Sequence, residues 1–261
     1  MTRALKAGCP QGSVLGPLLA IMYLNGLVDT TTNDVLLFAD DTSLHRPHTT
    51  DRNIIATQHS LQTDLDGIYH YGTQWAITFN ETKTVQQTFT HKLNTTSPCL
   101  KFGGQPVPIA NEHKHLGLTF SSDLRFHSHI NEIITKVNRT MSPLYPIAKY
   151  LSRNTLTQIY TAYILPIFDY CDVIYDGQIT MQDAQRLETT QNRAARLITG
   201  TPFRTSTDRL RQDLGLTTLS ARRKLHKIIL YHNIGHNPKV PECIKNILRN
   251  TRQRTRHTKN T

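Results

Sequence analysis

The strongest constraint on the fold is the stretch of residues 35–44, in which a four-residue apolar run leads directly into two adjacent carboxylates, Asp40 and Asp41. A second short run of polar and apolar residues follows them. This order predicts a buried strand, a tight turn and a returning strand. Asp is a common turn residue, so a plain hairpin tip is one interpretation. A divalent-cation site is the other, because a bound cation would remove the repulsion between the two charges, and hard oxygen ligands suit Mg²⁺.

A loop rich in glycine and proline precedes this hairpin. Three glycines and two prolines fall within residues 8–17. Such a loop allows backbone to pass close to a neighbour, either as a linker before a helix or as a loop whose amides and Gln11 face a ligand. Pro17 suits the first turn of a helix. The apolar residues that follow, up to Leu27, predict that this helix is largely buried.

The remainder of the first 120 residues predicts a mixture of helix and strand. Apolar residues at helical spacing from residue 51 to Trp75 predict a helix with a core-facing stripe. The other patterns predict a strand, a polar turn and a strand over residues 77–85, a small hairpin within 98–110, and a strand over 115–120. The fold class expected from these patterns is α+β.

After residue 121 the pattern becomes helical and basic. Apolar residues at helical spacing mark helices around residues 130–137, 156–163 (ending near Pro166), 187–198 (stopped by Gly200) and 225–231. Residues 1–120 hold 8 Lys and Arg against 9 Asp and Glu, a net charge of −1, whereas residues 121–261 hold 22 against 10, a net charge of +12. A chain that places its positive charge in one half is expected to offer that half to a polyanion, with nucleic acid as the leading candidate.

Two sets of basic residues stand at helical spacing and can share faces: Arg193 with Arg196, and Arg222 with Arg223 and Lys227. They are candidates for contacts to nucleic-acid phosphates, although for any single one of them a solvated helix face is the better explanation. Residues 249–261 carry five basic residues and no acidic one. We expect this tail to be disordered.

The composition limits the other classes of protein. The cysteines are scattered, with no Cys-x-x-Cys pair, which argues against a zinc site and fits a reducing compartment. No apolar run approaches the roughly 20 residues of a membrane span, and no signal peptide is visible. An intracellular location, nuclear or cytoplasmic, is expected, and no signal distinguishes between the two.

Four motifs, taken in order, resemble those of the reverse transcriptases of non-LTR (LINE-type) retrotransposons. The first is the loop Gly8-Cys9-Pro10-Gln11-Gly12 with the residues up to Leu19, which is similar to the loop and helix beside the incoming nucleotide. Phe38-Ala39-Asp40-Asp41 resembles the catalytic hairpin. Trp75 with Asn80-Glu81-Thr82-Lys83-Thr84 resembles the next palm motif, and His115-Leu116-Gly117-Leu118 resembles the primer-gripping hairpin, with His115 where the family usually has tyrosine. The helical segments 156–176 and 187–219 are similar to the region that follows in animal members.

The resemblance implies an RNA-directed DNA polymerase that uses two Mg²⁺ ions, an RNA template, a DNA primer and dNTPs. Asp40 would be the principal metal ligand and Asp41 its partner, while Gln11 and the Gly12 amide would position the nucleotide. Lys83 would neutralise or protonate the departing pyrophosphate, and Leu116 and Gly117 would form the primer grip. Residues 1–120 would be part of the palm, with an antiparallel sheet and packed helices, and residues 121–248 a thumb-like helical region that holds the duplex by its phosphates.

One departure qualifies this expectation. The family carries a further catalytic aspartate upstream of the glycine-rich loop, but only seven residues precede the loop here and none of them is acidic. We therefore expect a C-terminal fragment with little activity of its own. One alternative is a non-catalytic remnant that binds RNA or an RNA–DNA hybrid through its basic half. Another is a translation product that folds poorly because an incomplete sheet leaves an exposed edge.

Overall fold

The structure is a computed structural model that describes residues 14–47, 53–91, 96–202, 204–242 and 244–246. The chain divides into two compact units, Met1–His113 and Lys114–Thr261. Each unit is described by itself. The expected tail over residues 249–261 lies outside the described residues.

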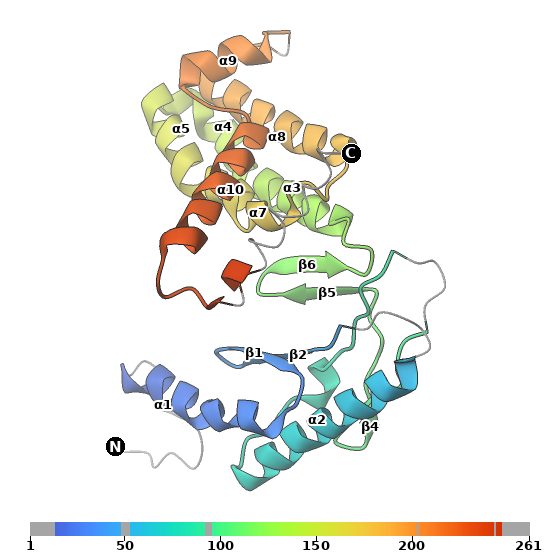
Figure 1. Ribbon diagram of the computed structural model, residues 1–261. Helices are drawn as coiled ribbons and strands as arrows, with labels where there is room; N and C mark the ends of the chain where they lie inside the picture. Colours follow the sequence, from blue (N-terminus) through green and yellow to red (C-terminus); the bar gives the residue numbers. More distant parts are fainter. Residues whose placement is uncertain (1–13, 48–52, 92–95, 203, 243, 247–261) are drawn as a thin grey trace. The chain divides into compact units, whose positions relative to one another are not determined.

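The first unit combines two helices with small hairpins (Figure 1). Its elements are α1 (Leu15–Leu24), the 3-10 turn η1 (Asn25–Thr30), β1 (Asp34–Phe38), β2 (Asp41–His45), α2 (Ile54–Gln74), the 3-10 turn η3 (Glu81–Lys83), β3 (Lys101–Phe102) and β4 (Gln105–Pro106). A small core joins them: Leu27, Ile68, Tyr71 and Phe102 are buried, and Leu37 of β1 packs against them. Strand β1 is thereby attached to α2 through only one of its faces.

The second unit is mostly helical. Its elements are the β5 (Glu112–His115) and β6 (Leu118–Ser121) hairpin, which begins at the unit boundary, then α3 (His127–Met141), α4 (Leu144–Ile147), η4 (Ala148–Tyr150), α5 (Arg153–Ile159), the π-turn η5 (Tyr160–Ile164), α6 (Leu165–Asp169), α7 (Asp172–Tyr175), α8 (Met181–Thr199), α9 (Thr207–Leu214) and α10 (Leu219–His236). The hydroxyls of Ser152, Thr180 and Thr218 accept backbone N–H bonds at the starts of α5, α8 and α10. These N-caps satisfy donors that a helix start leaves open.

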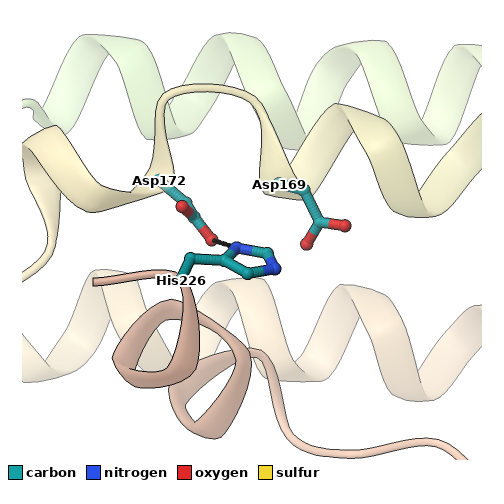
Figure 2. Close-up of side chains that lie close together, drawn as sticks. All are labelled: Asp169, Asp172 and His226. Atoms are coloured by element: carbon teal, nitrogen blue, oxygen red, sulfur yellow. Dashed lines mark hydrogen bonds and ion pairs between the residues drawn. The ribbon is translucent and has the colours of Figure 1, made fainter. Parts of the chain in front are cut away.

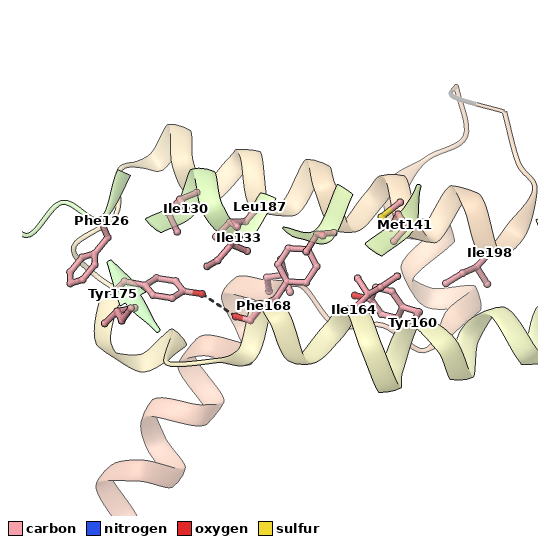
Figure 3. Packing of buried hydrophobic residues seen from close by; sticks show 14 of the residues in the cluster. Phe126, Ile130, Ile133, Met141, Tyr160, Ile164, Phe168, Tyr175, Leu187 and Ile198 are labelled. Atoms are coloured by element: carbon pink, nitrogen blue, oxygen red, sulfur yellow. Dashed lines mark hydrogen bonds between the residues drawn. The ribbon is translucent and has the colours of Figure 1, made fainter. Parts of the chain in front are cut away.

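The core of this unit forms along α3 (Figure 3). Ile130, Ile133, Val137 and Met141 recur at helical spacing and are all buried. They pack against Phe168 and its neighbours on the α5–α6 helix and against the buried face of α8, which carries Leu187, Ala194 and Ile198. The apolar periodicity of the sequence therefore marks the interior of this unit correctly.

The α+β class is confirmed, as are the helix over α2, the hairpin of β3 and β4, and the four helices after residue 121. The described residues form three separate two-stranded sheets rather than one continuous sheet. No described helix has both the length and the apolarity required to cross a membrane.

Five details of the prediction are wrong. Helix α1 is not largely buried: Leu18 is 53% exposed, Ile21 58% and Met22 66%, because no described element of this unit covers that face. The apolar run of β1 is only half-buried, since its burial alternates and Phe38 is 63% exposed. Both cases arise because apolar composition indicates which residues are able to be buried but does not supply the partner that buries them.

Two further errors concern local hydrogen bonding. Residues 77–85 form no strand pair; the Asn80 side chain instead accepts the Lys83 N–H and caps the 3-10 turn η3. Residues 115–120 are not one strand, because Leu116 and Gly117 make the turn between β5 and β6.

The helix predicted to end near Pro166 also continues to Asp169. It does so because the π-turn η5 restarts the hydrogen-bonding pattern, so that Pro166, which has no N–H, falls in the first turn of α6.

The α3 core gives a direct stability test. Ile130 is fully buried, so Ile130→Ala is expected to lower the free energy of unfolding of the second unit by about 3 kcal/mol through lost burial and a residual cavity. Ile228→Ala is the matched control, because Ile228 is 66% exposed and the same truncation should change stability by less than about 0.5 kcal/mol. Urea unfolding followed by circular dichroism measures both. Equal effects of the two variants would contradict the assignment of α3 to the core.

Candidate functional site

The carboxylates predicted to be catalytic lie at the tip of the β1–β2 hairpin. Phe38 pairs with Asp41, which leaves Ala39 and Asp40 as a two-residue turn. Because directly paired residues point to the same face, the Asp41 side chain lies on the exposed face with Phe38. Asp40 and Asp41 are both exposed, and within the described part of the chain neither makes a hydrogen bond or an ion pair through its side chain.

The turn itself is strained. Ala39 has a φ of +54°, in the left-handed region that a residue with a Cβ enters at a cost of about 1–2 kcal/mol. Strain of this kind persists only where the surroundings hold it, and it is concentrated at functional sites. The base of the hairpin shows what holds it here.

The base of the hairpin is fastened to α2 by a buried carboxylate, Asp64, which is 1% exposed. Asp64 accepts hydrogen bonds from the Thr32 backbone N–H (2.9 Å) and hydroxyl (3.0 Å), and from the Asn33 backbone N–H (2.8 Å) and side-chain amide (2.6 Å). At the same end of the hairpin, just after β2, Arg46 donates to the Asn33 side-chain oxygen (2.5 Å) and to the hydroxyl of Ser60 on α2 (2.7 Å). Both strands are thus anchored at the end opposite the carboxylates.

These contacts shift the pKa of Asp64. Burial raises the pKa of this carboxyl, but the hydrogen bonds from Thr32 and Asn33 together outweigh burial and hold the pKa below its usual range. Asp64 is therefore an anion with a structural role. The sequence analysis placed it on the helix without any role, because its four donors lie about 30 residues earlier in the chain.

The donor chemistry of the hairpin tip fits a divalent cation. Asp40 and Asp41 supply two adjacent hard oxygen ligands whose charges no described residue neutralises. The resemblance noted in the sequence predicts a divalent metal ion at this pair, and that assignment stays a prediction.

The other residues predicted for the first unit stand apart from this pair. Gln11 and Gly12 lie outside the described residues. Lys83 is exposed on η3, and among the described residues no hydrogen bond or ion pair connects it to Asp40 or Asp41. The catalytic role of Lys83 stays a prediction.

The predicted primer-grip residues form the turn of the β5–β6 hairpin. Leu116 and Gly117 both have positive φ, +47° and +80°. The Tyr170 hydroxyl, from the residue after α6, donates to the Leu116 carbonyl at 2.6 Å, and a Cβ on Gly117 would lie 3.3 Å from the Tyr170 ring. Glycine thus meets two requirements here, the backbone angle and the space beneath the ring. Tyr170 was not singled out by the sequence analysis, and its distance of more than 50 residues from the turn leaves no local signal.

Three of the five basic residues predicted to contact phosphates are already paired with carboxylates. Arg222 of α10 binds Asp169 through two hydrogen bonds, of 3.0 and 2.6 Å. Arg223 and Lys227 both bind Asp176, at 3.2 and 2.6 Å. Arg193 is exposed on α8, and Arg196 on the same helix is half-buried. Arg193 therefore has the more accessible charge of the two.

A cluster that the sequence analysis missed lies between α6, α7 and α10 (Figure 2). Ligand atoms of Asp169, Asp172 and His226 lie within 4.8 Å of one another, a spacing compatible with a metal ion. His226 Nδ1 is 2.7 Å from the carboxylate of Asp172, which is buried. Burial raises the pKa of Asp172, and the hydrogen bond with His226 offsets only part of that rise. Both Asp169 oxygens, however, accept hydrogen bonds from Arg222.

The ion pairs account for this cluster without a metal ion. Asp169 and Asp176 are matched by Arg222, Arg223 and Lys227, so a cation would have to displace a guanidinium from Asp169. We assign the group a structural role, in which it fastens α10 to α6 and α7. His226 lies 54 positions after Asp172, so no spacing motif could have revealed the cluster.

Comparison with known proteins finds similarity to RNA-directed DNA polymerases of mobile elements. Residues 1–120 match the family model described as reverse transcriptase (RNA-dependent DNA polymerase). The chain is 28% identical over 229 residues to the RNA-directed DNA polymerase from mobile element jockey of Drosophila melanogaster, a match that covers 83% of this chain. It is 30% identical over 225 residues to the probable RNA-directed DNA polymerase from transposon X-element of the same species, covering 82% of this chain.

A third relative, the probable RNA-directed DNA polymerase from transposon BS of Drosophila melanogaster, is 28% identical over 238 residues. The chain spans about a quarter of the length of these curated relatives, 24% for the first two and 26% for the third. No solved structure gives a significant match.

The Asp64 anchor predicts an acid-dependent loss of stability in the first unit. Because the folded-state pKa of Asp64 lies below its unfolded value, its contribution is fully present above about pH 4 and is lost as the pH falls through the folded-state pKa. Asp64→Asn should cost about 2–4 kcal/mol at pH 7 and remove that part of the acid sensitivity. Asp66→Asn, at an exposed position on the same helix, is the control. Urea midpoints at pH 7 and pH 3 check both; similar behaviour of the two variants would refute the anchor.

The β5–β6 turn predicts a difference between two glycines with left-handed backbone. Gly200→Ala introduces only backbone strain, because nothing lies within 4 Å of the added Cβ. Gly117→Ala adds a contact at 3.3 Å with Tyr170 to the same kind of strain. We expect Gly117→Ala to destabilise by about 1 kcal/mol more than Gly200→Ala, measured by thermal unfolding. A larger loss of stability for Gly200→Ala than for Gly117→Ala would contradict the close packing of Tyr170 on Gly117.

Proposed function

We propose that this chain, which belongs to the reverse transcriptases of non-LTR (LINE-type) retrotransposons, supplies the catalytic hairpin and the nucleic-acid-holding helical region of an RNA-directed DNA polymerase. The observation that carries the proposal is the hairpin tip. In the segment matching the family model, a strained two-residue turn presents Asp40 and Asp41 to solvent with no neutralising partner among the described residues.

Each site residue then has a role in nucleotidyl transfer. Asp40 and Asp41 would hold Mg²⁺, two ions in the intact site, which supply the positive charge that lowers the cost of primer activation and of pyrophosphate departure. Gln11 and Gly12 position the incoming nucleotide. Lys83 balances the negative charge on the departing pyrophosphate. The turn at Leu116 and Gly117, held by Tyr170, positions the primer end.

The substrates proposed are an RNA template, a DNA primer and dNTPs. In this proposal, residues 1–120 form part of the palm and residues 121–248 form a thumb-like region. The support for the second assignment is electrostatic: residues 121–261 have a net charge of +12, and non-specific binding to duplex comes from neutralising its phosphates. Because Arg222, Arg223 and Lys227 already have carboxylate partners, we place the main phosphate contacts on other basic residues, Arg193 among them.

A second candidate function follows from the same charge. A chain that holds an RNA–DNA hybrid through its basic half but does not extend the primer would show the same electrostatics. We propose that the 261-residue chain by itself behaves in this way, since the described hairpin offers two carboxylates and the family's chemistry uses a further one.

Template-primed DNA synthesis tests both proposals. The substrate is poly(rA)/oligo(dT) with dTTP and Mg²⁺, and the comparison is between the chain and its Asp40→Ala, Asp41→Ala variant. We expect synthesis close to background for both, and hybrid binding of similar strength in both, which weakens steeply as salt is raised from about 50 to 200 mM. Filter binding and primer extension are read in the same samples.

The outcomes separate the two functions. Synthesis that disappears in the double variant would show a site that is complete in this chain and would overturn the binding-only proposal. Absence of salt-sensitive binding would overturn the nucleic-acid role of the helical region.

A further inference from the structure

Two exposed histidines lie one helical turn apart near the C-terminal end of α10. His232 and His236 are four positions apart in the helix, so their side chains share a face. Their rings stack, with centroids 4.2 Å apart and planes inclined by 19°. Neither the candidate carboxylate site nor the phosphate contacts considered above include these residues, so the pair is a separate feature of the second unit.

A hydrogen bond of His236 determines which of its nitrogens is available. Its Nδ1 lies 2.8 Å from the backbone carbonyl of His232, and because a carbonyl oxygen only accepts hydrogen bonds, Nδ1 is the donor. In the neutral ring, Nε2 then keeps a free lone pair. Metal-binding histidines almost always have this arrangement, in which the other ring N–H is donated to a carbonyl or carboxylate and the ring orientation is thereby fixed.

The separation of the two rings fits a single metal ion. Two Zn–N bonds of about 2.1 Å at a tetrahedral angle place the two nitrogens about 3.4 Å apart. The nearly parallel rings have centroids 4.2 Å apart, so small side-chain rotations bring two nitrogens to that distance. The same spacing, two histidines at i and i+4 on one helix face, presents two ligands to zinc in helical metal motifs.

The surroundings of the pair are compatible with a cation. The neighbouring helix positions on this face carry the uncharged residues Ile228, Ile229 and Gly235. At Asp169, by contrast, the guanidinium of Arg222 already neutralises the carboxylate. His236 also lies in the last turn of α10, where the backbone carbonyls form the negative end of the helix dipole and favour a positive charge.

We propose that His232 and His236 form a binding site for a divalent transition-metal ion of the zinc class. The ion is held by one imidazole nitrogen from each residue, and its remaining positions are open to water or to ligands from a second copy of the chain. Imidazole suits Zn²⁺, whereas Mg²⁺ prefers oxygen ligands. The site therefore differs in chemistry from the Asp40–Asp41 pair and does not rest on the proposed polymerase function. The scattered cysteines argue against a cysteine-based zinc site and do not bear on a histidine chelate.

A bound ion would also tie together the last two turns of α10. Residues 228–233 are all exposed, so tertiary packing contributes little to the stability of this end of the helix. A chelate that joins positions 232 and 236 is formed only while the intervening turn is helical. Metal binding is therefore expected to stabilise the C-terminal end of α10.

Calorimetric titration of the full chain with ZnCl₂, in the presence of excess MgCl₂, tests the site. His232→Ala, His236→Ala should weaken zinc binding about tenfold or more, since even the loss of a group that only orients a ligand costs 10–100-fold. The matched control is Asn233→His, His236→Asn, which keeps the number of histidines but breaks the i,i+4 spacing at exposed positions. It should weaken binding as much as the double alanine variant. His59→Ala, His70→Ala removes two exposed imidazoles of α2 and should change the affinity by less than about twofold.

Amide hydrogen exchange gives a readout that does not depend on affinity alone. Zinc should slow the exchange of the amides at the end of α10 in the unsubstituted chain, and it should leave them unchanged in the Asn233→His, His236→Asn variant. The substituted positions are exposed, so circular dichroism of the variants is expected to match that of the unsubstituted chain.

Each outcome has a definite meaning. Zinc binding that is lost in both the alanine and the spacing variants supports the site; one ion per chain assigns the open positions to water, and one ion per two chains assigns them to a second copy. Equal zinc affinity of the unsubstituted chain and the spacing variant, displacement of zinc by Mg²⁺, or unchanged exchange at the end of α10 at saturation would each overturn the proposal. Failure of DNA synthesis or of hybrid binding would overturn the proposed function and leave zinc binding intact.

Discussion

The buried stripe of α3 is the contact on which the second unit depends. Ile130, Val137 and Met141 are fully buried, and both α8 and the α5–α6 helix pack against this stripe. The hairpin of β5 and β6 joins the same core through Leu118. Burying this face fixes the rotation of α3 about its axis, and the rotation determines that Lys136 and Arg139 are exposed on the opposite side.

Electrostatic pairing contributes the second level of organisation. Helix α10 is attached by Arg222, Arg223 and Lys227 to carboxylates around α6 and α7, while several of its apolar residues, Ile228 at 66% among them, stay exposed. A basic sequence is thus not the same as a basic surface, because part of the positive charge is used within the unit. What remains for a polyanion is carried by side chains such as Arg193, Lys136 and Arg139.

In the first unit, a single buried carboxylate holds the β1–β2 hairpin in place. Asp64 is buried and holds the base of the β1–β2 hairpin through four hydrogen bonds, while the two carboxylates at the tip remain exposed and unpaired among the described residues. Asp64 is stabilised as an anion by fixed hydrogen-bond donors, whereas the carboxylate oxygens of Asp40 and Asp41 remain available as ligands. The strained φ of Ala39 belongs to this arrangement, since a rigid base allows a tight, unfavourable turn to persist.

The sequence by itself determined the elements whose causes are local. Apolar periodicity marked α2, α3, α8 and α10, and an apolar run followed by two carboxylates marked the hairpin that carries Asp40 and Asp41. The motif order also identified the family. Only the tertiary structure decided which apolar residues are covered, as the exposed face of α1 shows, and which charges are already paired, as Arg222 shows. It alone joined Asp64 to Asn33 and Tyr170 to Leu116. The physical reason is that burial and pairing are properties of two surfaces in contact, and the two surfaces come from distant parts of the chain.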